Sequence, residues 1–360
     1  MSRPTQISID RSALLNNLNK VKTCAPLQKV MAVVKANAYG HGAVRIAQLA
    51  EPYIDAFAVC SLDEALVLKE KGIRKPLVLL EGFFYTDELA LIAHHHFEMV
   101  VHSPIQVEQL LSTSLSSPIN IWLKIDTGMH RLGFAPHEIK SLYQRLKVHP
   151  ARVGKIRMMS HLSCADDMQD RTTLLQTQVF NETILLFGVE TSLANSAGIM
   201  GWPQTHAHWV RPGIMLYGVS PFLHRTGQDE GLQPVMTLQS ILISVKTHHF
   251  GDAIGYGASW QCPETMPVGI VAIGYADGYP RHAPTGTPVL VNGQKVPLIG
   301  RVSMDMLAVD LRSQPYAKVG DPVILWGKGL PVEEIASRAG TIPYQLLCNM
   351  NPRVNRIEKE

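Results

Sequence analysis

The sequence has few cysteines and no long apolar run. Its five cysteines are odd in number, lie far apart and form no CxxC pair, which argues against a disulfide framework and a structural zinc site. The apolar runs are of strand length, well short of the ~18 residues of a membrane-spanning helix. The segment MSRPTQISID lacks the apolar region of a signal peptide. We therefore expect a cytoplasmic protein with no membrane partner.

An excess of charge of one sign is also missing. Thirty-three lysines and arginines against 30 aspartates and glutamates leave a formal net charge of +3, which does not favour a nucleic-acid-binding protein. The histidines at 94–96 would point in different directions on a helix. Those at 206 and 208 and at 248 and 249 have no acidic or cysteine companions at ligand spacing, so no metal site is expected. We therefore expect the binding partner to be a small molecule.

The apolar residues are arranged in a repeating pattern. The 360 residues are 46% hydrophobic, which indicates a large core, and the length suits two domains. Buried parallel strands need nearly continuous apolar runs because both of their faces are covered. Eight such runs, separated by amphipathic stretches, predict an α/β fold of the (β/α)8, TIM-barrel type, and a doubly wound sheet would show fewer. The runs are 30–35, 56–60, 76–81, 97–102, 119–126, 155–162, 190–196 and 208–211.

Two helix starts carry capping signals. Asp10 is a plausible N-cap for a helix whose apolar face includes Leu14 and Leu18. Ser61 and Glu64 have the spacing of a capping box, and Gly72 follows as a helix end. These helices fit between the strands of the predicted barrel.

The pattern changes after about residue 231. Strand candidates now follow one another without intervening helices, and Asn292-Gly293 supplies a hairpin turn between two of them. Two short helices, at 331–340 and 343–350, end the chain. We expect a barrel domain over residues 1–231 and a mostly antiparallel β domain over 232–360. The strand at 6–9 precedes the repeat and could pair with either domain.

Barrel active sites lie where the strands end. This rule selects five residues at or just after the ends of different strand runs: Lys35, Lys124, His161, Ser196 and Arg211. The wholly apolar run before Lys35 favours a lowered lysine pKa and Schiff-base reactivity. Loops after strands seven and eight commonly bind phosphate in barrels. A reactive lysine and a phosphate site on one face together suggest pyridoxal phosphate.

The segment VVKANAYGHG at 33–42 closely resembles the pyridoxal-phosphate attachment segment of bacterial alanine racemases. The resemblance covers essentially the whole chain and implies the family's fold and activity, the interconversion of L- and D-alanine that supplies D-alanine for peptidoglycan. It continues through KIDTGMHRLG at 124–133, His161, NSA at 195–197, RPGI at 211–214, GYG at 255–257, GYADGYPR at 274–281, GRVSMD at 300–305 and Tyr344.

The resemblance also implies roles for the matching residues. Lys35 would form the internal aldimine with pyridoxal phosphate and act as one of two bases. Tyr256 would be the other base, contributed to the partner's site in a head-to-tail homodimer. The phosphate would be held by Tyr39, Ser196, Gly213, Ile214 and Tyr344. Arg211 would face the pyridine nitrogen, with His161 linking it toward Tyr256.

The substrate side of the site follows from the same resemblance. Arg131 and the backbone at Met304 would orient the substrate carboxylate, with Asp305 in a supporting place. Tyr275 would narrow the entrance. In some family members a lysine matching Lys124 is carbamylated and steadies the arginine matching Arg131.

The chemistry of these roles is coherent. Racemisation removes a proton from one face of Cα and returns one to the other, so it needs bases on both faces. A tyrosine, with an ordinary pKa of ~10, is a poor base unless nearby cations favour its phenolate, and we expect His161 and Arg211 to supply that field. Arg211 would also disfavour protonation of the pyridine nitrogen and so suppress transamination.

Four alternatives remain at this point. A broad-specificity racemase and a barrel-type amino-acid decarboxylase are the nearest, although the decarboxylases lack the KANAYGHG and GYG patterns. A non-catalytic pyridoxal-phosphate carrier has a similar barrel but no second domain. A lysine Schiff-base aldolase without cofactor would leave the predicted phosphate site and Tyr256 unexplained.

Overall fold

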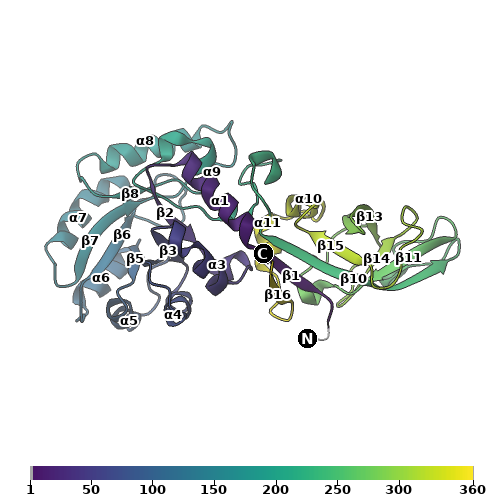
Figure 1. Cartoon of the computed structure of the whole chain (residues 1–360). Helices are drawn as coiled ribbons and strands as arrows, with labels where there is room; N and C mark the ends of the chain where they lie inside the picture. Colours follow the sequence, from purple (N-terminus) through teal and green to yellow (C-terminus); the bar gives the residue numbers. More distant parts are fainter. Residues whose placement is uncertain (1–2, 360) are drawn as a thin grey trace.

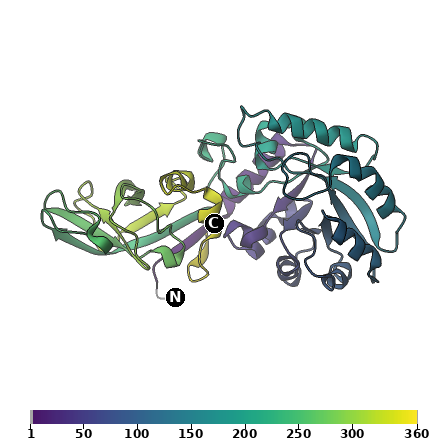
Figure 2. The same cartoon turned by 180° about the vertical axis from the view of Figure 1, so that it is seen from behind.

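A computed structural model describes residues 3–359 of the chain. It has two parts, a closed barrel and an eight-stranded sheet, joined end to end (Figure 1). Figure 2 shows the same elongated arrangement from behind, with β1 and α1 running between the two parts. No helix among the described residues is both long and apolar enough to cross a membrane.

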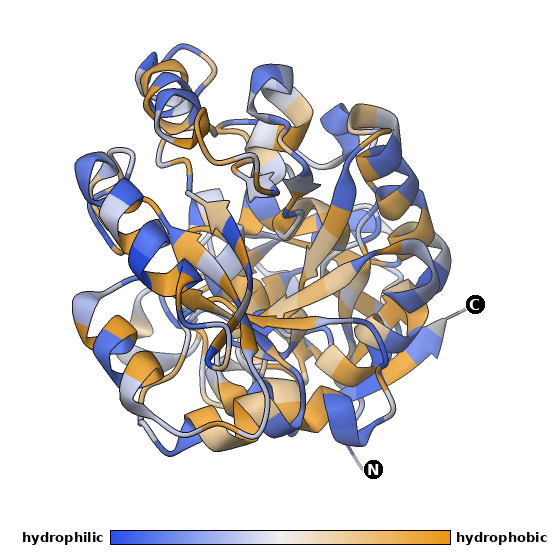
Figure 3. Cartoon of the chain, turned by 90° about the vertical axis from the view of Figure 1, so that its left-hand side faces the viewer, coloured by the Kyte–Doolittle hydropathy of each residue, from blue (hydrophilic) through white to orange (hydrophobic). Residues whose placement is uncertain are grey.

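The barrel confirms the sequence prediction strand by strand. Eight parallel strands close it in chain order within residues 29–210, and each lies within or overlaps one of the predicted apolar runs. The strands are almost wholly buried because helices cover them on the outside, and Figure 3 shows that they are largely hydrophobic. They are β2 (Lys29–Val33), β3 (Ala56–Val59), β4 (Leu77–Leu79), β5 (Glu98–Val101), β6 (Ile119–Lys124), β7 (Val153–Met159), β8 (Thr191–Ser192) and β9 (Trp209–Val210).

The helices around the barrel begin and end close to their sequence signals. Asp10 caps the first helix, and its carboxylate accepts a hydrogen bond from the Ala13 amide at 2.9 Å. The helices of this half are α1 (Arg11–Cys24), α3 (Ala43–Ala50), α4 (Leu62–Glu70), α5 (Glu88–His94), α6 (Pro104–Ser112), α7 (Ile139–Lys147), α8 (Thr172–Ile184) and α9 (Ser196–Gly201).

The capping box predicted at Ser61 is wrong. Ser61 is the N-cap residue of α4, but its side chain makes no capping bond. The Glu64 carboxylate reaches past the N-cap and accepts hydrogen bonds from the amides of Cys60, at 2.8 Å, and Ala36, at 2.7 Å. Glu64 therefore connects α4 to the end of β2 instead of closing its own helix start.

The second part is a mostly antiparallel sheet, as predicted. Its strand order is β11-β14-β13-β12-β15-β10-β1-β16, and β1 pairs antiparallel with β10 and parallel with β16. The opening strand thus belongs to this sheet and not to the barrel. The strands are β1 (Gln6–Asp10), β10 (Met236–His248), β11 (Met266–Val271), β12 (Pro288–Val291), β13 (Gln294–Ile299), β14 (Leu307–Asp310), β15 (Pro322–Trp326) and β16 (Asn355–Lys359).

Turns and short helices complete the sheet. Asn292 and Gly293 form the predicted hairpin turn between β12 and β13, with φ of 52° and 79°. The two predicted helices are present as α10 (Val332–Arg338) and α11 (Pro343–Cys348). α11 lies against the segment that follows β2, so it connects the sheet to the mouth of the barrel.

The hydrophobic core has two separate clusters. The larger one runs through the barrel and into the near part of the sheet. The smaller one includes Ile254, Met266 and Ile299 and lies around the far ends of β10, β11 and β13. The far end of the sheet thus has its own apolar support for the loops that it carries.

Candidate active site

The residues selected at the strand ends come together at the carboxyl-terminal mouth of the barrel. Lys35 follows β2, Lys124 ends β6, His161 follows β7 and Arg211 follows β9. Arg211 donates to the Ser160 carbonyl at 2.5 Å and to Nδ1 of His161 at 3.4 Å. The charges of Lys35, Arg211 and Arg131 all act on the Lys124 ammonium. The four residues therefore lie together in one cluster at the mouth.

Lys35 begins an unusual backbone segment, α2 (Lys35–Tyr39). Its next four residues, Ala36 to Tyr39, all have positive φ between 51° and 54°, so they form one left-handed turn. L-residues in this conformation cost roughly 1–2 kcal/mol each. Such strain persists only where the surroundings hold it, and it gathers at functional sites.

Side chains from several elements hold this turn in place. Glu64 of α4 accepts from the Ala36 amide, and Asn37 accepts from the Ala43 amide at 2.8 Å. His41 is fully buried, with Nδ1 2.9 Å from the Tyr39 carbonyl and its ring centroid 4.5 Å from that of Tyr217. These contacts determine where the chain leaves β2 and so where Lys35 lies.

A small polar cradle lies beside the Lys35 turn. Ser196, at the start of α9, accepts hydrogen bonds through Oγ from the amides of Gly213, at 2.9 Å, and Met215, at 3.4 Å. A Cβ on Gly213 would come within 2.8 Å of Tyr39 Oη, so only glycine leaves this space open. Ile214 begins the short helix η4 (Ile214–Tyr217), and Tyr344 of α11 lies 5.9 Å from Tyr39, ring to ring.

Arg211 is a fixed positive charge at the centre of the mouth. It is only 5% exposed and also donates to Ser192 Oγ, at 2.5 Å, and to the Leu193 carbonyl, at 3.2 Å. Burial lowers its pKa to about 10, so the guanidinium stays charged at neutral pH. Its hydrogen bonds to oxygens keep its plane in one orientation.

The electrostatics of the mouth favour an anion. Burial, followed by the charges of Arg211, Arg131 and Lys35, lowers the pKa of Lys124 to about 8. Burial and the same cations hold the pKa of His161 well below its ordinary value. Glu81 is the acidic neighbour that acts in the opposite direction on Lys124. Positive charge exceeds negative charge here, as a phosphate or carboxylate ligand requires.

His161 is therefore neutral at pH 7, which changes one expectation. A neutral imidazole cannot supply the positive field that we expected from His161 together with Arg211. Because Arg211 donates to Nδ1, the proton of His161 lies on Nε2. The positive field comes from Arg211 and Arg131, and His161 remains as a hydrogen-bond donor.

Several polar residues of the mouth were missed in the sequence. Cys60, after β3, donates its thiol to Glu81, after β4, at 3.2 Å, and Glu64 holds the Ala36 amide. The barrel rule could have found Cys60 and Glu81, since they are the last residues of two predicted strand runs. Glu64 carried no such signal because its capping-box spacing suggested a purely local role.

Three predicted residues lie apart from this cluster, on the sheet. Tyr256, in η6 (Tyr256–Ala258), is 69% exposed, Met304 is 53% exposed and Tyr275, in η7 (Tyr275–Asp277), is 40% exposed. The Tyr275 and Ala276 amides donate to the carbonyls of Ser303 and Met304. All three side chains are therefore accessible from outside the chain.

Arg131 and Asp305 complete the set of predicted site residues. Arg131 is exposed on the loop after β6 and acts electrostatically on Lys124. Asp305 follows Met304 and pairs with Arg353 at 2.7 Å. Among the described residues, no group of histidine, cysteine and acidic side chains could hold a metal ion.

Comparisons with known proteins give one consistent result. The family description "Alanine racemase, N-terminal domain" matches residues 9–221, and "Alanine racemase, C-terminal domain" matches residues 235–358. The alanine racemase of Nitrosococcus oceani is 53% identical, with 98% of each chain covered. That of Halorhodospira halophila is 48% identical, covering 99% of this chain and 98% of its own.

Solved structures agree over the whole length. The biosynthetic alanine racemase from Pseudomonas aeruginosa has a TM-score of 0.96 at 44% identity, and that from Acinetobacter baumannii has 0.92 at 37% identity. Each comparison covers 99% of this chain and 100% of the other. Matching domains, sequence and fold lead to one conclusion: the chain belongs to the alanine racemase family.

Proposed function

We propose that the protein is a pyridoxal-phosphate-dependent alanine racemase that interconverts L- and D-alanine and so supplies D-alanine for peptidoglycan. The observation that carries this proposal is the barrel mouth, where Lys35 begins a strained turn beside the Ser196 cradle and an excess of positive charge. An aldolase without cofactor would need the lysine but not the cradle.

The residues of the mouth fit the cofactor. The space that glycine leaves open at Gly213, next to Tyr39 Oη and Ser196 Oγ, suits a phosphate oxygen that accepts hydrogen bonds. We assign the phosphate to Tyr39, Ser196, Gly213, Ile214 and Tyr344, and covalent attachment to Lys35. When bound, the cofactor acidifies the Cα proton of the substrate and accepts its electrons.

Two groups of the protein would move the proton at Cα. Lys35 Nζ takes it up or returns it on one face, and Tyr256 of the partner subunit serves the other face through its phenolic oxygen. The exposure of Tyr256 supports this assignment, because an exposed tyrosine can enter another copy's site. We therefore propose a head-to-tail homodimer in which residues 1–231 provide the barrel domain, apart from β1, which pairs in the sheet, and residues 232–360 reach the partner's mouth.

Arg211 and His161 would set the electrostatics of this exchange. The charged Arg211, placed at the pyridine nitrogen, opposes protonation there and so limits the lifetime of negative charge at Cα. The Nε2 proton of His161 can be donated to the phenolate oxygen of Tyr256 of the partner subunit. A base of this kind contributes about 10²–10⁴ in rate when it is correctly held.

The substrate carboxylate would meet Arg131 of the barrel and the Met304 backbone of the sheet, while Tyr275 narrows the entrance. We also propose that Lys124 is carbamylated and steadies Arg131. Carbamate formation needs a neutral amine, and a Lys124 pKa of about 8 leaves a neutral fraction at physiological pH. Intact mass measured with and without dissolved CO₂ tests that modification.

The direct test of the activity follows the Cα proton. Purified protein with added pyridoxal phosphate is mixed with L-alanine in D₂O, and proton NMR is combined with an assay for the D-enantiomer. Loss of the Cα proton signal together with D-alanine is the expected result. A pyridoxal-loaded protein that gives neither would refute alanine as substrate, and a panel of other amino acids would then decide between the remaining racemase and decarboxylase alternatives.

A second test locates the cofactor. Borohydride reduction followed by peptide mass analysis should place the pyridoxyl group on the peptide that contains Lys35. Unmodified Lys35, or a modified lysine elsewhere, would contradict the assignment.

A further inference from the structure

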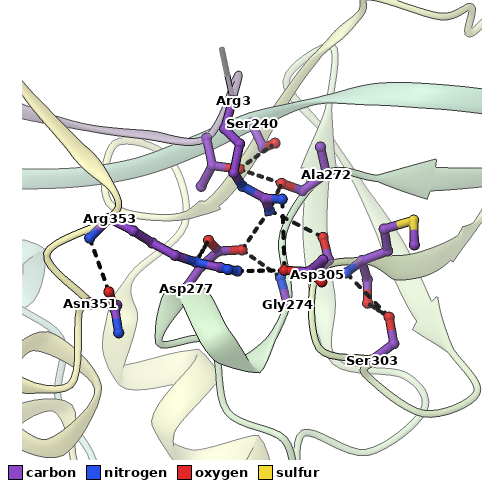
Figure 4. A network of polar contacts seen from close by, with 11 residues as sticks. Arg3, Ser240, Ala272, Gly274, Asp277, Ser303, Asp305, Asn351 and Arg353 are labelled. Atoms are coloured by element: carbon purple, nitrogen blue, oxygen red, sulfur yellow. Dashed lines mark hydrogen bonds and ion pairs between the residues drawn. The ribbon is translucent and has the colours of Figure 1, made fainter. Parts of the chain in front are cut away.

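Four charged residues form a network that connects the η7 turn, which carries Tyr275, to the Met304 loop (Figure 4). They are Arg3, Asp277, Asp305 and Arg353. Asp277 lies at the centre of the network, with its side chain only 1% exposed. Its carboxylate accepts from Arg3 Nη2 at 2.9 Å and from Arg353 Nε at 2.7 Å. Arg353 Nη2 also pairs with Asp305 at 2.7 Å. Two arginines and two aspartates thus make a neutral set in which each arginine contacts both carboxyl groups.

The network joins distant parts of the chain. Arg3 precedes β1, Arg353 precedes β16, and Asp277 ends the η7 turn. The Asn351 amide donates to the Asp277 carbonyl at 3.1 Å. The beginning and the end of the chain therefore meet at this one carboxylate.

Asp277 acts on the Met304 loop through Gly274. Oδ2 of Asp277, the oxygen that also accepts from Arg3, accepts from the Gly274 amide at 3.0 Å. Gly274 lies directly on the Met304 peptide, because a Cβ at Gly274 would come within 2.4 Å of the Met304 carbonyl oxygen. The amides of Tyr275 and Ala276 then donate to the Ser303 and Met304 carbonyls at 3.1 and 3.0 Å.

The other side of the same loop is held by Arg3. Its Nη2 also donates to the Asp305 carbonyl, at 3.3 Å, and to the Ala272 carbonyl, at 3.1 Å. The Met304 peptide is thus fixed between the η7 turn and the two arginines, while the Met304 side chain faces outward at 53% exposure. The network orders a loop that carries proposed substrate contacts.

We propose that Asp277, together with Arg3 and Arg353, is a positioning residue for substrate, which holds the Met304 backbone and the Tyr275 ring where the partner's site receives the alanine carboxylate. This inference rests on the proposed function. A backbone hydrogen bond to a charged carboxylate is worth roughly tenfold or more in affinity, so loosening the network should weaken alanine binding. The cofactor contacts lie on the barrel and on α11, outside the network.

The test compares two Asp-to-Asn variants of the full-length, cofactor-loaded protein. Asp277→Asn removes the central charge of the network. Asp310→Asn is the matched control, because Asp310 is also a buried aspartate that pairs with an arginine, Arg312, at 2.8 Å in the same sheet. We expect Asp277→Asn to raise the KM for alanine by roughly tenfold or more, with kcat and cofactor absorbance little changed. Asp310→Asn should leave the KM unchanged.

Two further variants keep the test decisive if Asp277→Asn does not fold. Arg3 is about one-third exposed, and Arg3→Ala should raise the KM in the same way. Arg353→Ala should do so too, and Arg353→Lys should restore part of the loss because lysine can still pair with Asp277. Unchanged KM values in folded Asp277→Asn and Arg3→Ala would overturn the inference, as would an equal rise in Asp310→Asn.

Amide hydrogen exchange gives a readout that does not depend on activity. Without substrate, residues 301–306 should exchange faster in Asp277→Asn than in the wild type, while the barrel segments around Lys35 should not change. Equal exchange of 301–306 in both proteins would contradict the positioning role. Absence of racemisation in the wild type would refute the proposed function instead, and the exchange result would still decide whether the network orders the loop.

Discussion

At the scale of single residues, the proposed phosphate site at the barrel mouth requires open space as well as positive charge. Gly213 has no side chain where a Cβ would approach Tyr39 Oη to 2.8 Å. We expect Gly213→Ala to crowd the phosphate site at a cost of roughly 1–3 kcal/mol, which is about ten- to hundredfold in the Kd for pyridoxal phosphate. Absorbance titration of the apoprotein with the cofactor measures this change.

Gly269→Ala is the control for that substitution. A Cβ at Gly269 would come within 2.8 Å of Leu311 in the sheet, so it adds the same crowding away from the barrel. It should lower thermal stability without weakening cofactor binding. An equal loss of cofactor affinity in both variants would show that crowding anywhere is enough, and would contradict the role given to Gly213.

Tyr256 should act on only one face of the substrate. Tyr256→Phe removes the phenolic oxygen and retains the ring, so it should slow proton abstraction from one enantiomer by about 10²–10⁴. The other enantiomer should still exchange its Cα proton through Lys35. Solvent deuterium incorporation, measured separately from L- and D-alanine, checks this asymmetry, and equal losses for both enantiomers would count against two bases.

At the scale of elements, the left-handed turn after Lys35 should make stability depend on pH. His41 supports this turn, and burial lowers its pKa to about 4, whereas an unfolded histidine titrates near ~6.5. Between these two values the unfolded chain binds one more proton than the folded chain. Unfolding therefore becomes easier as the pH falls from about 6.5 toward about 4, at up to ~1.4 kcal/mol per pH unit from this residue.

His41→Gln removes this titration and leaves an amide that can donate to the turn. Denaturant unfolding of both proteins at several pH values between these limits measures the difference. The free energy of unfolding should fall less steeply with decreasing pH in the variant. Parallel pH profiles would show that His41 does not carry the effect.

A cluster of ion pairs lies at the end of the barrel opposite the mouth. Glu190, just before β8, accepts from Lys29 of β2 and from Lys155 and Arg157 of β7, at 2.6 to 2.7 Å. Burial alone would raise the Glu190 pKa, but these three hydrogen bonds hold it well below its usual range. The contribution of Glu190 to the free energy of unfolding is therefore present above a pH of ~4.5. It is lost as the pH falls toward the lower pKa that Glu190 has in the folded protein.

We expect Glu190→Gln to lower the free energy of unfolding by about 2 kcal/mol at pH 7, with the difference shrinking in acid. Glu108→Gln is the control, because Glu108 pairs with Arg145 on an exposed surface and should change stability by less than ~1 kcal/mol. Chemical denaturation at pH 7 and pH 4 checks both. A Glu190→Gln difference that grows in acid would contradict the assignment.

The elements that were predictable are those whose cause is local. The apolar runs identified the strands, down to β8 and β9, which have only two paired residues each, and Asn292-Gly293 identified a hairpin. The left-handed turn was not predictable, because Ala36 and Ala38 carry no signal for positive φ and an asparagine such as Asn37 adopts it as a single residue, not as part of a left-handed turn. The hydrogen bond from the Ala36 amide to Glu64 and the charged network around Asp277 were not predictable either. The residues that these contacts join lie far apart in the sequence.

At the scale of the whole molecule, the proposed site residues form two groups. Lys35, Arg211 and their neighbours lie at the barrel mouth, whereas Tyr256 and Met304 are exposed on loops of the sheet. The individual residues were accessible from sequence, through the strand-end rule and the family resemblance. The placement of these residues in two groups became visible only in three dimensions, and the proposed head-to-tail homodimer would bring the two groups together.

The central claim is that one active site takes Lys35 from one chain and Tyr256 from another. Mixed dimers of Lys35→Ala and Tyr256→Phe chains, purified through two different tags and loaded with pyridoxal phosphate, test it most directly. Each variant alone should not racemise alanine. A mixed dimer has one site with an intact Lys35 and the intact Tyr256 of the partner subunit, so it should regain racemisation. Mixed dimers as inactive as both parents would contradict the claim.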